Sequence, residues 1–207
     1  MKIKTAQKVF YKEEISSVEN FYSFLDKKKL IVFVPENFTE KLTNELSRAG
    51  AGSIGNYSMC SFRTNGVGTF LPGKKADPFS GIKNKLSFEN EVKLEMECDD
   101  YDLNHILNSL LKNHPYEEVV YEIYSFTKRA EEPSGFCINL NKRLSYNELI
   151  KRLNRKIDCD NVTGKDYFKK IVITETEVTE NIINSAKLTG SDCLLLFSKK
   201  INKLFKL

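Results

Sequence analysis

Residues 91–97 alternate strictly between charged and apolar side chains, with Val92, Leu94 and Met96 as the apolar members. A period of two places successive side chains on opposite faces of a β-strand. The alternation therefore predicts a strand with one buried face and one wet face. It is the clearest strand in the sequence, and the neighbouring elements are placed relative to it.

A helix and a second strand follow this strand directly. Between residues 103 and 111, leucine and isoleucine recur at positions i, i+3, i+4, i+7 and i+8, which marks one face of a helix. Asp99 or Asp100 is expected to cap the helix, and Pro115 lies just past its end. Residues 119–126, rich in β-branched and aromatic side chains, predict the next strand.

A strand and a helix are also predicted upstream of residue 50. Residues 30–34 (LIVFV) form a continuous apolar run of strand length, typical of a strand buried on both faces. Asn37 and Glu40 have the spacing of a capping box, and the apolar residues after them share one helical face until Gly50 provides the stop.

Asn65-Gly66 predicts a tight turn between two strands. It separates residues 57–63 from residues 67–71, so we expect an antiparallel hairpin here. Together with the elements on either side, this gives an α+β fold. The order corresponds to a ferredoxin-like βαββαβ domain with an elaborated hairpin.

Residues 1–29 are expected to form an N-terminal helical segment. Ile15, Val18, Tyr22 and Leu25 recur at spacings of three and four, which places them on one helical face. Because this face is narrow, a helix docked on the domain is favoured over a membrane or partner helix.

Residues 135–207 are expected to form a small α/β part. Residues 136–140 alternate as a short strand, and Ser145 with Glu148 has the spacing of a helix-capping box. Strands are predicted at 171–174 and 193–197, and the helix between them, closed by Gly190, implies a parallel βαβ crossover. The apolar helix faces are Leu149, Leu153 and Ile157 for the first helix, and Val178, Ile182 and Ala186 for the second.

The composition favours a reduced cytoplasmic protein. The 207 residues are 41% apolar, and a chain of this size buries roughly 70% of its unfolded surface. The five cysteines are odd in number and show no CxxC or Cys/His zinc spacing. The net charge of +4 arises from interspersed charges, which describes a solvated surface better than a nucleic-acid footprint. With no apolar stretch near 18 residues and no apolar signal core, no membrane partner is expected.

Residues 30 to about 126 resemble the PII-like/CutA-like domain that is inserted in the bacterial NIF-three-like family, whose members are often labelled GTP cyclohydrolase 1 type 2 homologs. The resemblance is carried by FVPEN, GAGSIGNYSMCSFRTNGVGTFLPG, ADPFSG, EVKLEME and NHPYEEVVYEIY. It implies a PII-like/CutA-like domain at residues 30–128, similar to proteins that form trimers. In the family this domain sits between two halves of a larger α/β domain that carries a dinuclear metal site.

The departures from the family imply that this metal site is absent. Where family members carry a Gly-rich turn, this chain has TETEVTEN (174–181), and where they carry a Gly-Asp and a His it has FSKKINK (197–203). The family's first half has no counterpart before the domain, and residues 135–207 resemble a truncated second half. Only His105 and His114 are available as imidazole ligands. We therefore expect no catalytic residue, no metal and no cofactor.

Cys60, His114 and Glu117 form the candidate ligand-binding site. If the two stretches that carry the resemblance adjoin in space, these side chains make a polar cluster for a metal or a small ligand. The structural alternative is that His114 interacts with the terminal carbonyls of its own helix and that Cys60 fills core space. The family position of Ser53 is commonly a histidine, which counts against the ligand interpretation.

Two classes of function remain. The favoured one is a non-enzymatic regulatory or assembly protein that forms a homo-oligomer, expected to be a trimer, and binds a small-molecule effector between subunits. The alternative is a metal-dependent hydrolase or GTP cyclohydrolase-type enzyme of the parent family, acting through metal-activated water. Nucleic-acid binding through the Lys-rich tail has no aromatic platform to support it.

Overall fold

The chain divides into two compact units. A computed structural model describes residues 9–153, 157–159, 166–175, 177–197 and 202–207. Unit 1 comprises Met1–Leu25 and Lys128–Leu207, and unit 2 comprises Asp26–Thr127. Unit 2 is thus inserted in the sequence of unit 1, and the N-terminal residues belong with the C-terminal part instead of forming a segment of their own.

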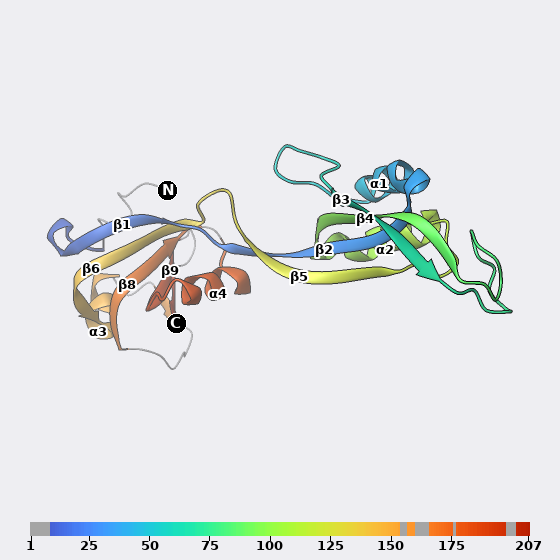
Figure 1. Cartoon of the computed structure of the whole chain (residues 1–207). Coiled ribbons are helices and arrows are strands. Elements are labelled where there is room, and N and C mark those ends of the chain that lie inside the picture. The colour runs from blue at the N-terminus through green and yellow to red at the C-terminus, as the bar shows by residue number, and fades with distance from the viewer. Residues whose placement is uncertain (1–8, 154–156, 160–165, 176, 198–201) are drawn as a thin grey trace. The chain divides into compact units, whose positions relative to one another are not determined.

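Unit 2 is a sheet of four strands in the order β3-β4-β2-β5, with two helices (Figure 1). The pairs β2–β4 and β3–β4 are antiparallel. One helix follows β2 and the other follows β4. The elements are β2 (Phe24–Pro35), α1 (Thr39–Arg48), β3 (Phe62–Phe70), β4 (Ser87–Asp99), α2 (Leu103–Asn113) and β5 (Tyr121–Arg129), with short 3-10 turns at Glu36–Phe38 and Asp100–Asp102.

The core of unit 2 lies between one face of this sheet and the two helices. The predicted alternation in β4 is confirmed, because Val92, Leu94 and Met96 are buried while the charged residues between them are only half-buried on the other face. Both helices contribute to the same apolar cluster, so they cover the same face. Its further members include Leu30, Val32 and Val34 of β2, Leu42 and Leu46 of α1, and Ile106 and Leu110 of α2.

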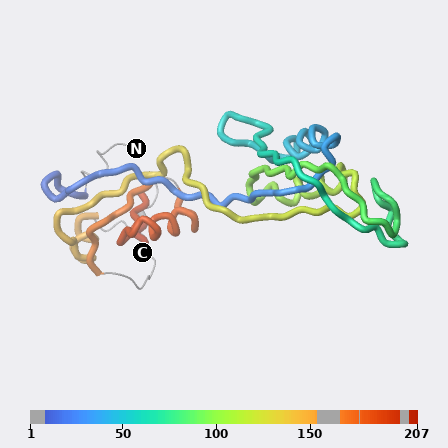
Figure 2. Tube along the Cα trace, viewed as in Figure 1, coloured from blue at the N-terminus to red at the C-terminus, as the bar shows by residue number. Residues whose placement is uncertain are grey.

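Unit 1 is a sheet of six strands in the order β1-β6-β8-β9-β10-β7. In Figure 2 the blue trace of β1 runs beside the yellow trace of β6, with which it pairs antiparallel. The elements are β1 (Ile15–Phe21), β6 (Gly135–Ser145), α3 (Tyr146–Arg152), β7 (Ile157–Cys159), β8 (Tyr167–Thr174), α4 (Glu180–Leu188), β9 (Cys193–Phe197) and β10 (Asn202–Lys206), after a 3-10 turn at Lys12–Glu14.

The two helices of unit 1 cover opposite faces of its sheet. Ile171 and Ile173 of β8 share a cluster with Leu149 of α3, whereas Val172 packs in a second cluster with Ile182 of α4. Successive strand residues point to opposite faces, so the central strands are buried on both sides. The predicted βαβ crossover is confirmed, since β8 and β9 pair in parallel and α4 connects them. The fold of the whole chain is α+β, as predicted. No helix in the described residues is long and apolar enough to cross a membrane.

The predicted N-terminal helix is wrong. Residues 15–21 form β1, and Phe24 already begins β2. The expected helical face left out Phe21, which is the fully buried aromatic residue of this stretch, and included Leu25, which is exposed. A spacing of three and four between apolar residues does not distinguish a helix from an irregular strand. Pairing with β6 makes this segment a strand.

The predicted hairpin around Asn65-Gly66 is also wrong. Both residues lie inside the single strand β3, where Asn65 is paired with Val92 and Gly66 with Glu91. Nine consecutive pairs with β4 outweigh the local turn preference. The hairpin connection is formed instead by residues 71–86, between β3 and β4.

Two of the predicted helix caps are wrong and one is confirmed. Neither α1 nor α2 has a side-chain cap, because a 3-10 turn precedes each helix. Asp99 is instead paired with Lys27 at 2.6 Å. Ser145 does cap α3, since its hydroxyl accepts the Glu148 N–H at 3.3 Å. Ile157, expected on the α3 face, begins β7.

Candidate functional site

Both ring nitrogens of His114 are engaged. The residue caps the C-terminus of α2 and is only 7% exposed. The Tyr116 N–H donates to Nδ1 at 3.1 Å, so Nε2 carries the hydrogen and donates to the Phe33 carbonyl at 3.0 Å. Burial lowers the pKa of the ring, which favours this neutral form. This carbonyl belongs to β2. The expected contact with the residue's own helix is made by the backbone N–H of His114, which donates to the Leu110 carbonyl at 2.9 Å. Neither ring nitrogen is left to bind a metal.

Cys60 lies apart from His114. It precedes β3 in a loop, where its N–H donates to the Gly52 carbonyl at 2.9 Å, and the Gly52 N–H donates to the Glu97 carbonyl at 2.8 Å. The histidine contacts Phe33, which pairs with Lys93. The two positions are therefore four residues apart along β4, at Lys93 and Glu97, which is about 13 Å at roughly 3.3 Å per residue. At this distance Cys60 does not form a cluster with His114. Its side chain is half-buried, so it does not fill core space either.

Glu117 lines a cavity of about 270 Å³ in unit 2. The cavity lies where β3 ends and β4 begins, and it is bordered by the connection 71–86 and the segment before β5. We call it the Tyr116 cavity. Of the three predicted site residues, Glu117 lines it directly, His114 supports it through the hydrogen bond to Tyr116, and Cys60 is not among its lining residues.

Tyr116 and Glu91 form a fixed pair in the wall of this cavity. The Tyr116 hydroxyl donates to Oε1 of Glu91 at 2.7 Å. Burial, and then the Glu91 carboxylate, raise the pKa of Tyr116 far above its ordinary value, so the hydroxyl keeps its proton and remains the donor. On the other side of the carboxylate, a Cβ on Gly68 would overlap its oxygens. The missing side chain at Gly68 is what leaves room for the carboxylate.

Aromatic rings join the connection 71–86 to the body of unit 2. Phe79 packs edge-on against Phe38 with ring centres 5.4 Å apart, and its ring centre lies 5.9 Å from that of Tyr116. Tyr116 in turn meets His114 at 4.9 Å. These contacts hold Phe79 over the cavity although the residue is 44% exposed.

The charge of the cavity is negative. Glu91, Glu117 and Glu118 are among its lining residues, and no Lys, Arg or His is. Glu117 is oriented by the Asp77 N–H, which donates to its Oε1 at 2.8 Å. The remaining wall is mostly apolar and aromatic, and includes Phe70 and Phe79. Such a wall can bind and orient a ligand, but it offers no nucleophile paired with a base.

The described residues do not fit a dinuclear metal centre. Among them, no three His, Cys, Asp or Glu side chains come together in a way that could hold a metal ion. Of the segment 197–203, where the Gly-Asp and His of the family were sought, residues 198–201 lie outside the described part of the chain.

Sequence reasoning missed three residues of this cavity. Tyr116 stood inside the HPYEE stretch but was not singled out, and Glu91 looked like an ordinary residue of a wet strand face. Gly68 carried the only available indication, because an isolated glycine within a strand often marks a close approach of another group. The pattern did not show which group approaches it.

Comparisons with known proteins give partial matches. No family model matches the chain. Proteins called GTP cyclohydrolase 1 type 2 homolog are similar to it. The one from Halalkalibacterium halodurans is 37% identical over 131 residues, 63% of this chain and 35% of the relative. The one from Bacillus subtilis is 34% identical over 170 residues, 80% and 45%. The one from Listeria innocua is 35% identical over 173 residues, 81% and 46%. The chain thus spans less than half the length of these relatives.

Solved structures also show a likeness. A Bacillus cereus protein related to NIF3 has a TM-score of 0.48 and 24% identity, covering 96% of this chain and 56% of that protein. CutA from Synechococcus elongatus has a TM-score of 0.38 and 16% identity, covering 55% of this chain and 86% of CutA.

Proposed function

Although this chain belongs to the NIF-three-like family of GTP cyclohydrolase 1 type 2 homologs, we propose that it is a non-enzymatic regulatory or assembly protein. In this proposal unit 2 is a PII-like/CutA-like module that associates with copies of itself, as a trimer, and binds a small effector. Cytoplasmic localisation is part of the same proposal.

The order of elements in unit 2 supports a ferredoxin-like module. Helix α1 follows the first strand and α2 follows the third, which gives the sequence βαββαβ. The sheet order β3-β4-β2-β5 places the first and third strands in the centre and leaves the second and fourth at the edges.

The observation that carries the proposal of self-association is the second face of the unit 2 sheet. Within unit 2, both helices pack on the face that holds Leu94. On the opposite face Phe62 is paired with Glu95 and is 67% exposed. Lys29 and Lys93 both contact this Glu95, at 3.2 and 3.1 Å. Aromatic residues are enriched at the centre of protein interfaces, so Phe62 favours this face as the one that a second copy covers.

The edges of the sheet provide a second means of association. β3 and β5 are the edge strands, and the backbone groups of an edge strand are ready to pair with another chain. An edge of one copy that meets a different edge of the next copy makes a heterologous contact. Such contacts close into a ring when the rotation between neighbouring copies divides a full turn, and a trimer is a ring of this kind.

The proposal that the protein works without catalysis rests on the donor set. The three carboxylates that the Tyr116 cavity holds are not clustered as metal ligands. The alternative, a metal-dependent hydrolase or GTP cyclohydrolase-type enzyme, is suggested by the name that the relatives carry. It would act through metal-activated water.

Light scattering on the purified chain, with metal analysis and a GTP turnover assay on the same sample, separates the two functions. We expect a mass of about three times the 23.8 kDa of one chain, and no turnover. We expect Phe62→Lys to reduce the mass to that of the monomer. Val67→Lys is the matched control, since Val67 is 63% exposed on the same strand but paired with Asn90, on the other face. A monomeric chain, or bound metal with GTP turnover, would refute the proposal.

A further inference from the structure

The Tyr116 cavity has the size and wall of a site for a small molecule. Its volume of about 270 Å³ lies just below the roughly 300–1,000 Å³ typical of ligand pockets, so the occupant is small. Phe70 and Phe79 contribute aromatic surface, and apolar surface predominates in the wall. Part of the ligand is therefore apolar.

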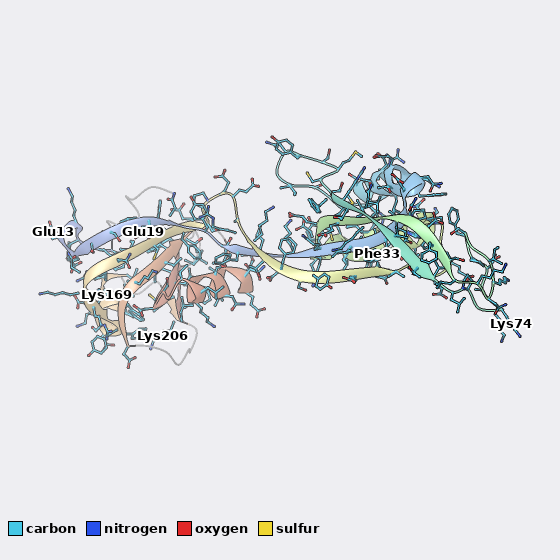
Figure 3. All side chains as sticks on the ribbon, in the orientation of Figure 1. Glu13, Glu19, Phe33, Lys74, Lys169 and Lys206 are labelled. Atoms are coloured by element: carbon cyan, nitrogen blue, oxygen red, sulfur yellow. The ribbon has the colours of Figure 1, made fainter. Side chains whose placement is uncertain are left out.

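The charged groups of the wall select the sign of the ligand. Glu91, Glu117 and Glu118 line the cavity, and among the described residues no Lys or Arg forms an ion pair with any of them. The lysines of the neighbouring connection do not line the cavity, and Figure 3 shows Lys74 at the tip, pointing away from the body of unit 2. A nucleotide, phosphate or carboxylate would meet only like charge here.

The carboxylates are already held in place. The Tyr116 hydroxyl holds the Glu91 carboxylate, which occupies the space that a Cβ on Gly68 would fill. The Asp77 N–H holds Glu117. Groups that are oriented before binding lose less conformational freedom when a ligand arrives. Each hydrogen bond engages one oxygen, and a carboxylate has acceptor capacity for further donors.

A further polar group stands unused in the wall. Among the described residues, the hydroxyl oxygen of Ser80 is the one buried side-chain oxygen or nitrogen without a hydrogen-bond partner. Ser80 lines the cavity. A ligand in the cavity reaches this oxygen only if the Ser80 side chain rotates, because less than 1 Å² of the atom is exposed.

We propose that the Tyr116 cavity binds a small organic cation, an ammonium group carried on a short apolar body. The ammonium group donates to the carboxylates of Glu91 and Glu117, and the apolar body contacts Phe70 and Phe79. Aromatic faces attract cations in addition to providing apolar surface. The inference depends on the proposed effector-binding role and names the chemical class of the effector.

A metal ion is the competing cation, and the geometry disfavours it. No three carboxylate, thiol or imidazole groups converge among the described residues. A divalent metal ion needs several oxygen ligands in a tight shell. An ammonium group has only three N–H donors and tolerates a looser arrangement of acceptors.

The test is a calorimetric titration of the full chain with three amines, 2-phenylethylamine, hexylamine and isopentylamine. Each is compared with the alcohol and the carboxylate of the same carbon skeleton. We expect at least one amine to bind below about 1 mM, and its alcohol and its carboxylate to bind about tenfold more weakly or not at all. Raising the salt concentration is expected to weaken binding of the amine.

Variants assign the binding to this cavity. Glu117 is exposed, so the Glu117→Gln variant should fold normally. We expect this variant to bind the amine about tenfold more weakly. Glu91→Gln should have a similar effect. Glu45→Gln is the control, because Glu45 is paired with Arg48 on α1 and does not line the cavity. Circular dichroism of each variant reports whether it is folded.

The inference is overturned if no amine binds, if a carboxylate binds as tightly as its amine, or if Glu117→Gln in a folded protein leaves the affinity unchanged. The mass measured by light scattering reports separately on the proposed function. A trimer without amine binding removes this inference and leaves the assembly role. A monomer that binds amines through Glu117 refutes the assembly role and supports the cavity as the amine-binding site.

Discussion

The hydroxyl of Tyr116 lies 2.7 Å from a carboxylate oxygen of Glu91 and donates a hydrogen bond to it. The two residues come from different elements of unit 2, since Glu91 is in β4 and Tyr116 lies between α2 and β5. The contact therefore ties the segment after α2 to the sheet. It also orients one of the carboxylates of the cavity.

Tyr116→Phe should destabilise the protein by about 1 kcal/mol, because the carboxylate loses a hydrogen bond in a partly buried site. Urea denaturation measures the change. Tyr124→Phe is the matched control, since Tyr124 donates to Glu122 over the same 2.7 Å but is 52% exposed, where water replaces the lost bond. Equal losses in the two variants would show that burial does not strengthen the Tyr116 bond.

Gly68→Ala should be destabilising by about 1–3 kcal/mol, because the added Cβ overlaps the Glu91 carboxylate and forces it to move. Gly66→Ala is the control two residues away on the same strand, where a Cβ meets nothing within 4 Å. It should leave stability unchanged or raise it slightly. If thermal denaturation gave both variants the same midpoint, overlap of the added Cβ with the Glu91 carboxylate would not be destabilising.

The buried ring of His114 should make stability depend on pH. Burial places the pKa of His114 in the folded state below its ordinary value of 6.5, so the unfolded chain binds the proton more readily. Stability is therefore fully present above pH 6.5 and declines below it, by at most about 1.4 kcal/mol per pH unit. Denaturation at several pH values between 5 and 8 measures the slope. His114→Gln should remove this contribution, whereas substitution of the exposed His105 by Gln should retain it.

Arg152 of α3 should stabilise unit 1 through Glu14. Its guanidinium nitrogens contact the two carboxylate oxygens at 2.6 and 2.8 Å, and its side chain is 16% exposed. Arg152→Met should be destabilising by about 1 kcal/mol, whereas Arg48→Met, at an exposed pair with Glu45, should have almost no effect.

The contribution of this pair should vanish in acid. The hydrogen bond from Arg152 lowers the pKa of Glu14 below its ordinary value of 4.5. The stabilisation is therefore present above pH 4.5 and is lost as the pH falls through the lower pKa of the folded state. If the difference between the protein and Arg152→Met remained the same at pH 2, the ion pair would not be its cause.

Elements with a strong periodic pattern could be predicted from the sequence. The alternation of Val92, Leu94 and Met96 placed β4 correctly, and the leucine spacing placed α2. Both patterns are produced directly by burial of one face, so they appear in the sequence wherever the face is buried. The parallel pairing of β8 with β9 followed from the helix between them.

The candidate site could be predicted only in part. Glu117 was predicted as a site residue because it lies in NHPYEEVVYEIY, a stretch that carries the family resemblance, and it does line the cavity. Glu91 and Gly68 are distant from Glu117 in sequence. The pairing of β3 with β4 brings Gly68 beside Glu91, and the hydrogen bond from the Tyr116 hydroxyl joins Glu91 to the segment after α2. A cavity is a property of the folded arrangement, so no spacing in the chain indicates it.

By itself the sequence determined the mixed α+β class and the elements whose periodicity records a buried face. The tertiary structure alone decided that residues 15–21 form a strand, that Asn65-Gly66 lies within β3, and that Tyr116 meets Glu91. The physical reason is that these three features depend on partners far along the chain. The energy of strand pairing and side-chain contact with those partners exceeds the local preferences that a sequence pattern expresses.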